Sequence, residues 1–272
     1  MNKKDQLLET TQYIKSKGFE SPEIGIVLGT GLGKLINEID IIKEIPYSDI
    51  PHFPQATVEF HSGKLIYGTI ENKKVIVMSG RFHLYEGYNP WQVTYGIRTM
   101  HSLGIKKLLI SNAAGAINLN YKKGDLMLLE DHINLQGSSP LAFANVGEFG
   151  DQFADMLEPY SKNLNTQMKA IASTYDLVLH EGTYVGVLGP QLETRAEYRM
   201  LGLMGADAVG MSTVPEVIVA KHLKLETVAV SVLTDECDPD NLQPVNIAEI
   251  IAIAGEAEPK MILLFKELIK TI

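Results

Sequence analysis

Four short segments of the sequence combine glycine or other small residues with side chains that bind anions. They are LGTGLG at 28–33, GRFHLYEG at 80–87, SNAAG at 111–115 and GMSTVPE at 210–216. Arg81 supplies a permanently charged, forked donor for an oxyanion, and His83 adds a donor whose charge varies with pH. The hydroxyls of Thr30 and Ser212, together with backbone N–H groups, are suited to complete such a site. If the four segments meet in space, they form a site for free phosphate.

The glycine-rich segment at 28–33 does not fit the two common nucleotide-binding fingerprints. After Gly29 and Gly31, the third glycine position of the dinucleotide motif holds Lys34. Leucine at positions 28 and 35 breaks the phosphate-loop pattern of nucleotide triphosphatases. Two interpretations stay open for this segment: a tight turn between a strand and a helix, or a nest of N–H groups that holds a phosphate.

The other segments also have structural alternatives. Arg81, His83 and Tyr85 alternate, so in an extended backbone they share one face. A solvated polar edge is the alternative, but glycine and aromatic residues close the segment on both sides, which favours a site. The small residues at 111–115 let a backbone approach a ligand closely, although alone they specify little. Ser212 precedes a predicted helix, where it either caps the helix or binds an anion at the positive end of its dipole.

Acidic, histidine and cysteine residues do not indicate a metal or a thiol nucleophile. Glu193 precedes a predicted helix and is either a partner of the helix dipole or a functional carboxylate. Asp235 and its acidic neighbours resemble a calcium loop, but the required glycine and terminal glutamate are absent. The seven histidines show no HExxH or paired spacing, so we expect no protein-bound zinc. Cys237 has no local partner that would activate it.

Composition excludes several classes of protein. The 24 Lys and Arg residues against 33 Asp and Glu give a net charge of −9, and we expect no binding to nucleic acid. The longest apolar runs are five residues, at 250–254 and 261–265, whereas a membrane span needs about 20. The first ten residues do not form a secretory signal, and one cysteine allows no internal disulfide. We therefore expect a cytoplasmic protein that does not enter a membrane.

The hydrophobic patterns predict alternating strands and helices. In the first half we expect a helix around 7–14, a strand at 24–28, a hairpin of 64–70 and 74–78, a helix from Asn89 to Gly104 and a strand at 107–110. In the second half we expect strands at 183–188, 207–209 and 227–233, and helices that open at capping boxes 194–197 and 213–216. A last helix covers 246–270.

This order of elements predicts an α/β fold with a mixed, largely parallel sheet that helices flank on both faces. No repeat or linker divides the chain, so we expect one domain over 1–272. Ligands of such sheets bind at the C-terminal ends of the strands. The four anion-binding segments lie where strands are predicted to end.

The motifs resemble those of the trimeric, low-molecular-mass purine nucleoside phosphorylases, within the family that also contains the methylthioadenosine phosphorylases. The resemblance rests on GTGLG at 29–33, GRFHLYEGY at 80–88, SNAAG at 111–115, EGTYVGVLGPQLET at 181–194 and GADAVGMSTVPEVIVA at 205–220. It implies a phosphorylase/hydrolase-like fold and a homotrimer. It also implies cleavage of a purine nucleoside by inorganic phosphate to the free base and ribose 1-phosphate, with no metal or organic cofactor.

The resemblance also implies a role for each matching residue. Phosphate would be bound by Thr30, His61, Arg81, His83, the Ala113 backbone and Ser212. Ribose would be contacted by Tyr85, Tyr184, Met211 and Ile247, and by Phe149, which resembles an aromatic residue that reaches into the pocket of the neighbouring subunit. The base would be contacted by Ala114, Gly115, Glu193 and Asp235, and the catalytic groups would be His83, Glu193 and Asp235.

Two departures from the family pattern bear on the substrate. Asp235 stands where enzymes for 6-oxopurines usually have asparagine, and Ile247 stands where a histidine usually meets the ribose 5′-hydroxyl. An ionised aspartate only accepts hydrogen bonds and repels the purine O6, whereas a protonated one could donate to it. Both departures point toward methylthioadenosine phosphorylases, but those enzymes carry serine where this chain has Glu193. We therefore expect inosine and guanosine as substrates, with methylthioadenosine or another 6-aminopurine nucleoside as the alternative.

The chemistry of nucleoside cleavage agrees with these motifs. Breaking the C1′–N9 bond builds positive charge on the ribose and negative charge on the base, so an anion is needed on one side and a hydrogen-bonding partner on the other. A nucleoside-binding sensor without activity is a remote alternative, because it would not need phosphate, ribose and base contacts together. A hydrolase is a weaker alternative still, because its anion-binding groups would be idle.

Overall fold

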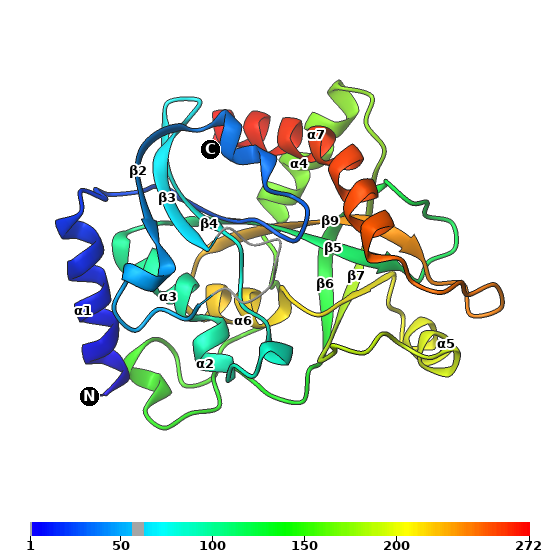
Figure 1. Ribbon diagram of the computed structural model, residues 1–272, viewed down its shortest axis with the longest axis horizontal. Coiled ribbons are helices and arrows are strands. Elements are labelled where there is room, and N and C mark those ends of the chain that lie inside the picture. Colours follow the sequence, from blue (N-terminus) through cyan, green and yellow to red (C-terminus); the bar gives the residue numbers. More distant parts are fainter. Residues whose placement is uncertain (1, 56–62) are drawn as a thin grey trace.

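The computed structural model describes residues 2–55 and 63–272 (Figure 1). Its strands are β1 (Ile24–Val27), β2 (Asp40–Pro46), β3 (Lys64–Ile70), β4 (Lys73–Ser79), β5 (Lys107–Ala116), β6 (Leu126–Leu135), β7 (Leu179–Val187), β8 (Ala208–Gly210) and β9 (Glu226–Glu236). Its α-helices are α1 (Lys3–Ser16), α2 (Pro90–Val93), α3 (Tyr95–Leu103), α4 (Lys162–Thr174), α5 (Arg195–Leu203), α6 (Val214–His222) and α7 (Ile247–Thr271). Short 3₁₀ turns are η1 (Lys34–Glu38), η2 (Tyr47–Asp49), η3 (Leu84–Glu86) and η4 (Val146–Glu148).

The strands of the described residues form one mixed sheet in the order β2-β3-β4-β1-β5-β8-β7-β6-β9. β5 also pairs with β9, so the last five strands close into a ring. β1 runs parallel to β4 and β5, and β5 runs parallel to β9. The carboxyl ends of these four strands therefore meet at the same edge of the sheet. The mixed α/β sheet with flanking helices confirms the predicted fold class.

The two faces of the sheet are buried under separate groups of helices. Along β5, Leu108 and Ile110 pack in one hydrophobic cluster and Leu109 in the other, as the alternation of side chains along a strand requires. The first cluster includes residues of α1, α2, α3 and α6, and the second includes residues of α4 and α7. Figure 1 shows α4 and α7 above the sheet, with α2, α3 and α6 below it.

Several predicted elements have different limits in the structure. The predicted strand at 107–110 continues to Ala116, because its second half pairs with β9 and β8, so residues 111–115 lie within a strand and not in a loop. The predicted helix from Asn89 is divided at Thr94, whose hydroxyl donates to Pro90 O at 2.8 Å. Its capping at Asn89 is confirmed.

The capping box predicted at 213–216 is wrong. Thr213 has a φ of +63° and makes no capping hydrogen bond, although Pro215 does occupy the first turn of α6. Glu216 does not cap the helix but forms an ion pair with the buried Arg81. The capping box at Thr194 and Glu197 is confirmed, since both of its hydrogen bonds are present.

The strands β2 and β6 and the helix α4 were not predicted from the sequence. The edge strand β2 is mostly exposed and has no clear alternation, so its sequence gave little signal. β6 begins with the apolar run 126–129, and α4 buries Leu164, Met168 and Ala172 at helical spacing. These last two patterns would have identified both elements.

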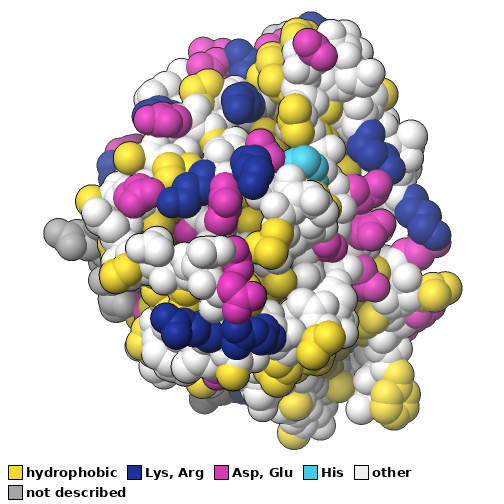
Figure 2. Space-filling view, turned by 90° about the vertical axis from the view of Figure 1, so that its right-hand side faces the viewer, with side chains coloured by type: hydrophobic (Ala, Val, Ile, Leu, Met, Phe, Trp, Pro, Cys, Tyr) yellow, Lys and Arg dark blue, Asp and Glu magenta, His cyan; other side chains and the backbone are white. Residues whose placement is uncertain are grey.

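On the surface seen in Figure 2, Lys and Arg side chains lie among Asp and Glu side chains. Among the ion pairs of the described residues, Arg199 on α5 lies 2.5 Å from Asp240. No helix among the described residues is both long and apolar enough to cross a membrane.

Candidate active site

A cavity of about 220 Å³ opens where the carboxyl ends of β1, β4, β5, β8 and β9 come together. This is the sheet edge at which the sequence predicted a ligand. The cavity is lined by Thr30, Arg81, His83, Tyr85, Asn112, Ala113, Ala114, Gly115, Leu192, Glu193, Tyr198, Val209, Gly210, Met211, Ser212, Thr234, Asp235, Ile247 and Ile250. The structure thus brings together most of the residues that the sequence singled out.

Three predicted site residues are not among those that line the cavity. Tyr184 is fully buried behind it, and its hydroxyl accepts a hydrogen bond from the Ser212 N–H at 3.3 Å. Phe149 packs instead against Trp91 and Phe143, with ring centroids 5.2 and 5.8 Å away. His61 lies outside the described residues.

At one end of the cavity, the glycine-rich loop after β1 lies directly on β5. The Gly29 N–H donates to Ser111 Oγ at 3.1 Å, and a Cβ at position 29 would come within 2.8 Å of the Ser111 carbonyl oxygen. Gly31 has a φ of +72°, a conformation that favours glycine. The close approach fixes the loop that presents Thr30 to the cavity.

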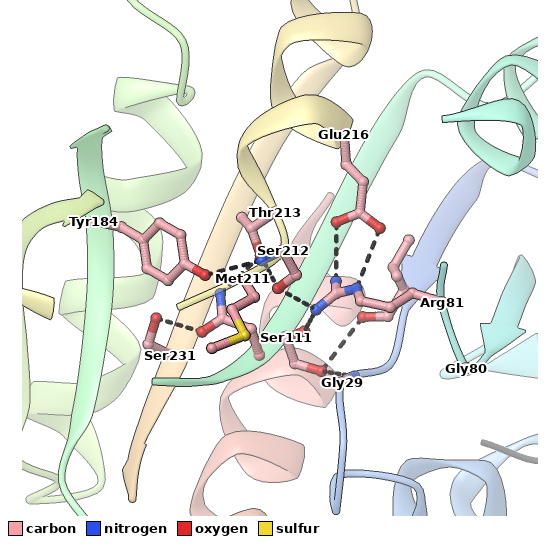
Figure 3. Close-up of polar contacts among 12 residues, drawn as sticks. Gly29, Gly80, Arg81, Ser111, Tyr184, Met211, Ser212, Thr213, Glu216 and Ser231 are labelled. Carbon is pink, nitrogen blue, oxygen red and sulfur yellow. Dashed lines mark hydrogen bonds and ion pairs between the residues drawn. The ribbon is translucent and has the colours of Figure 1, made fainter. Parts of the chain in front are cut away.

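Arg81 is held at the same end by a buried ion pair with Glu216 (Figure 3). Arg81 Nε donates to Glu216 Oε1 at 3.2 Å, and Nη2 lies 3.1 Å from Oε2. The Nη1 group donates to the Ser111 carbonyl at 2.8 Å and to Ser212 Oγ at 3.2 Å. The two charged side chains are only 1% and 2% exposed. A buried charge is costly unless it is paired, so Glu216 explains how Arg81 remains under the cavity floor.

The segment after Arg81 departs from the extended geometry that the sequence predicted. Tyr85 lies in the turn η3, because Gly87 adopts a φ of +89° and the chain folds back. The Tyr85 ring stacks on His83 at 4.6 Å, so both side chains still line the cavity. Burial raises the pKa of Tyr85 to about 12.

His83 is buried and hydrogen-bonded to Glu86. Its Nδ1 lies 2.8 Å from Glu86 Oε1, which also accepts the His83 backbone N–H at 2.7 Å. Burial lowers the pKa of His83, although Glu86 acts in the opposite direction. A neutral ring that donates from Nδ1 presents Nε2 as an acceptor, which suits a protonated phosphate oxygen.

At the other end of the cavity, Asp235 is held by its neighbours in the chain. Thr234 Oγ1 donates to Asp235 Oδ1 at 2.9 Å, and the Cys237 thiol donates to Oδ2 at 3.3 Å. Gly115 faces them so closely that a Cβ there would come within 2.9 Å of Asp235 Oδ2. This end therefore presents an oriented carboxylate to a ligand.

Glu193 lies at the same end, in the segment before α5. Burial raises the pKa of Glu193, and the charge of Asp235 acts in the same direction, whereas a hydrogen bond with Tyr198 opposes the shift. Leu192 and Ile247 complete this end and are 42% and 55% exposed. The cavity thus has a polar, enclosed end and a more open, acidic end.

Several residues of this site were not predicted from the sequence. Asn112 lies inside a quoted motif but was given no role, and Tyr198 and Thr234 were overlooked. Glu216 was interpreted only as a capping residue. A glutamate between the apolar residues of VPEVIVA was a usable signal, because a buried carboxylate needs a cationic partner. Within the part of the chain that the structure describes, no group of three His, Cys, Asp or Glu residues could hold a metal ion.

Comparison with known proteins agrees with this geometry. Residues 23–270 match the family model described as the phosphorylase superfamily. Purine nucleoside phosphorylase 1 of Geobacillus stearothermophilus is 44% identical, with 96% of both chains covered, and the Bos taurus purine nucleoside phosphorylase is 39% identical, with 93% of this chain and 90% of its own covered.

Solved structures of relatives have the same fold. The Schistosoma mansoni purine nucleoside phosphorylase in complex with inosine superimposes with a TM-score of 0.93 at 39% identity, covering 98% of this chain and 96% of its own. Isoform 2 from the same organism, in complex with cytosine and ribose-1-phosphate, gives a TM-score of 0.94 with the same identity and coverage. This chain therefore belongs to the purine nucleoside phosphorylases of the phosphorylase superfamily.

Proposed function

We propose that this enzyme catalyses the reversible phosphorolysis of inosine, guanosine and their deoxy forms to the free base and (deoxy)ribose 1-phosphate. The observation that carries the proposal is one cavity with Thr30, Arg81 and Ser212 at one end and Glu193 and Asp235 at the other. Relatives have been solved with inosine and with adenosine, both from Schistosoma mansoni, and with guanosine, from Schistosoma, which supports a purine nucleoside as the substrate.

The enclosed end suits the attacking phosphate. Thr30, Arg81, His83, the Ala113 N–H and Ser212 would hold phosphate there, with His61 as a further ligand from the family resemblance. A nucleophile held beside C1′ no longer loses the entropy of an encounter with the nucleoside. The phosphate charge also stabilises the positive ribose that forms as the C1′–N9 bond breaks.

The open end suits the departing base. Glu193 would accept hydrogen bonds from the N1 region of a 6-oxopurine, and Asp235 would contact N7, with Ala114 and Gly115 along the ring. Tyr85 and Met211 would contact the ribose between the two ends, Ile247 would meet its 5′ side from the open end, and Tyr184 would lie behind them. Catalysis requires that these contacts strengthen as negative charge develops on the base.

A second candidate is phosphorolysis of methylthioadenosine or another 6-aminopurine nucleoside. The observation that favours it is Asp235, whose two carboxylate oxygens accept hydrogen bonds within the chain and would attract an amino group more than O6. The apolar side chain of Ile247 at the cavity favours it as well. Glu193 opposes it, because a carboxylate matches the N1–H of a 6-oxopurine.

The assembly is a further part of the proposal. Phe149 lies away from the cavity of its own chain, next to Trp91, which is compatible with a trimer in which it completes the ribose pocket of a neighbour. We also infer a cytoplasmic enzyme in which residues 1–272 act as one domain. Sedimentation would test the trimer. For a Phe149→Ala variant, sedimentation would also show whether a loss of activity comes from dissociation of the subunits or from weaker ribose binding in an intact trimer.

Chromatography of the released base tests the substrate proposal. Inosine, guanosine, adenosine and methylthioadenosine are each incubated with and without phosphate. Phosphate-dependent release of hypoxanthine and guanine is expected. Release of adenine from methylthioadenosine alone would assign the specificity to Asp235 and Ile247 and refute the first proposal.

A further inference from the structure

Beneath the enclosed end of the cavity, four polar side chains form one hydrogen-bonded series, of which Figure 3 labels Ser231, Thr213 and Ser212. Ser231 Oγ donates to Asn112 Oδ1 at 2.7 Å, and Asn112 Nδ2 donates to Thr213 Oγ1 at 2.9 Å. Thr213 Oγ1 in turn lies 3.2 Å from Ser212 Oγ. Ser231, Asn112 and Thr213 are buried, whereas Ser212 is only partly buried and faces the cavity. The series therefore runs from the protein interior to the site.

The direction of these hydrogen bonds follows from the acceptors that are present. A buried hydroxyl hydrogen needs an acceptor, and Thr213 already receives the amide of Asn112. Among the described residues, Ser212 Oγ is the acceptor within reach of the Thr213 hydroxyl. Turning the Asn112 amide around would leave the Ser231 hydroxyl without an acceptor among these residues. The hydrogens therefore point from Ser231 toward Ser212.

This direction determines where the Ser212 hydroxyl points. Its oxygen accepts from the Thr213 hydroxyl and from Arg81 Nη1, which lies 3.2 Å away. With both lone pairs engaged, the hydrogen of Ser212 remains to be donated, either to the neighbouring Tyr184 hydroxyl or into the cavity. A phosphate oxygen carries negative charge and is the stronger of these two acceptors, so a bound phosphate would take the hydrogen bond. Hydrogen bonds in such a series polarise one another, so the Ser212 hydroxyl becomes a better donor to an anion.

The backbone at Thr213 shows that this arrangement is maintained at a cost. Its φ of +63° is unusual for a β-branched residue, and such a conformation persists only where surrounding contacts compensate for its strain. The hydroxyl does not cap α6, so helix capping does not account for the conformation. The conformation does place the Thr213 hydroxyl between Asn112 and Ser212.

We propose that Thr213 is a positioning residue that orients the Ser212 hydroxyl toward phosphate, with Asn112 and Ser231 as the supporting part of the series. This inference rests on the proposed function, because it takes Ser212 as a phosphate ligand. Thr213 itself does not line the cavity and need not touch the substrate.

Thr213→Val tests this role, because valine keeps the branched shape and removes the hydroxyl. We expect the phosphate KM to rise about tenfold, the size of effect expected from one lost hydrogen bond, while the inosine KM changes less than about twofold. Thr213→Ser is the matched control, since it keeps the hydroxyl, and its phosphate KM should stay within about twofold of the wild type. An unchanged phosphate KM in Thr213→Val, or an equal rise in both KM values, would overturn the inference.

A double-mutant cycle separates positioning from general damage. If Thr213 acts through Ser212, Thr213→Val should raise the phosphate KM by less than about twofold in a Ser212→Ala background. An undiminished tenfold effect in that background would refute the role. If Ser212→Ala alone leaves the phosphate KM unchanged, this inference is wrong, whereas the proposed function fails only if phosphate-dependent cleavage is itself absent.

Discussion

The two ends of the cavity are built in opposite ways. At the phosphate end, Arg81 and Glu216 are almost completely buried, and Arg81 is held by groups distant in sequence, on β5, in α6 and just before α6. At the base end, Leu192 and Ile247 are about half exposed, and the contacts to Asp235 come from its own sequence neighbours. The phosphate end is therefore rigid before any ligand binds, which favours fast attack.

The enzyme is therefore constrained at the phosphate end and adjustable at the base end. A change at the phosphate end disturbs a buried network and should affect all nucleosides alike. A change at the base end alters one exposed or half-buried contact and should separate one nucleoside from another.

Arg81→Ala should reduce kcat/KM for phosphate by about 100-fold, because it removes a charged donor to the anion. It should reduce turnover of inosine and guanosine by the same factor. Steady-state kinetics at varied phosphate concentration measures both. Phosphate dependence equal to that of the wild type would remove Arg81 from the site.

The same variant has a consequence for stability. Glu216 would be left buried without its cation, which typically costs about 3–5 kcal/mol. The midpoint of thermal unfolding of Arg81→Ala should therefore fall clearly. The midpoint of Arg81→Lys should fall less, because lysine keeps the positive charge, although it lacks the forked geometry. Equal midpoints for Arg81→Ala and the wild type would show that the ion pair is not what holds this end together.

Asp235→Asn should increase 6-oxopurine turnover relative to 6-aminopurine turnover about tenfold, because asparagine can donate to O6 and still accept from N7–H. The comparison of kcat/KM for inosine and adenosine measures the ratio. Asp240→Asn is the control, since Asp240 is exposed and does not line the cavity. An unchanged ratio in Asp235→Asn would contradict the division between the two ends.

The pH dependence of nucleoside binding should report on Glu193. Burial raises the pKa of Glu193, so its carboxylate becomes protonated at a higher pH than an exposed glutamate does. Since the ionised form accepts the hydrogen bond of N1–H, kcat/KM for inosine should fall severalfold as the pH falls through that pKa. Glu193→Gln should flatten this acid limb, and a limb that persists in the variant would assign it to another group.

Ile247→His should have the smallest effect, lowering the inosine KM about threefold through one added hydrogen bond to the 5′-hydroxyl. The KM for methylthioadenosine should not improve, because its 5′ substituent is apolar. Val245→His is a suitable control, because Val245 is exposed in the loop just before α7 but does not line the cavity. The same gain in both variants would indicate a general effect of the added histidine.

The same division separates what the sequence could predict from what it could not. Glycine, arginine and hydroxyl residues near predicted strand ends indicated the phosphate end, because their combination in four segments supplies the N–H, hydroxyl and guanidinium donors that an anion needs. The partners of those residues, such as Glu216 with Arg81, are distant in sequence and had no local pattern. Thr213 likewise has a positive φ and a hydrogen bond with the distant Asn112, and neither feature can be predicted from the capping pattern around it.

The fold was predictable to a similar extent. The strongly apolar strands around β1, β4 and β9 and the helix α7 were correctly predicted, since their patterns reflect burial on the sheet. The length of β5 was not, because residues 111–116 are small or polar and are strand only through their pairing with β8 and β9. Tertiary pairing there overrides local propensity.

The most direct test of whether phosphate attacks the ribose is to follow phosphorus during the reaction of inosine. Phosphorus NMR distinguishes inorganic phosphate from ribose 1-phosphate, and chromatography of the same samples measures hypoxanthine. We predict that one phosphate is converted to ribose 1-phosphate for each hypoxanthine released. Hypoxanthine released without consumption of phosphate would show that water attacks the ribose, and it would contradict the assignment of the enclosed end of the cavity to phosphate.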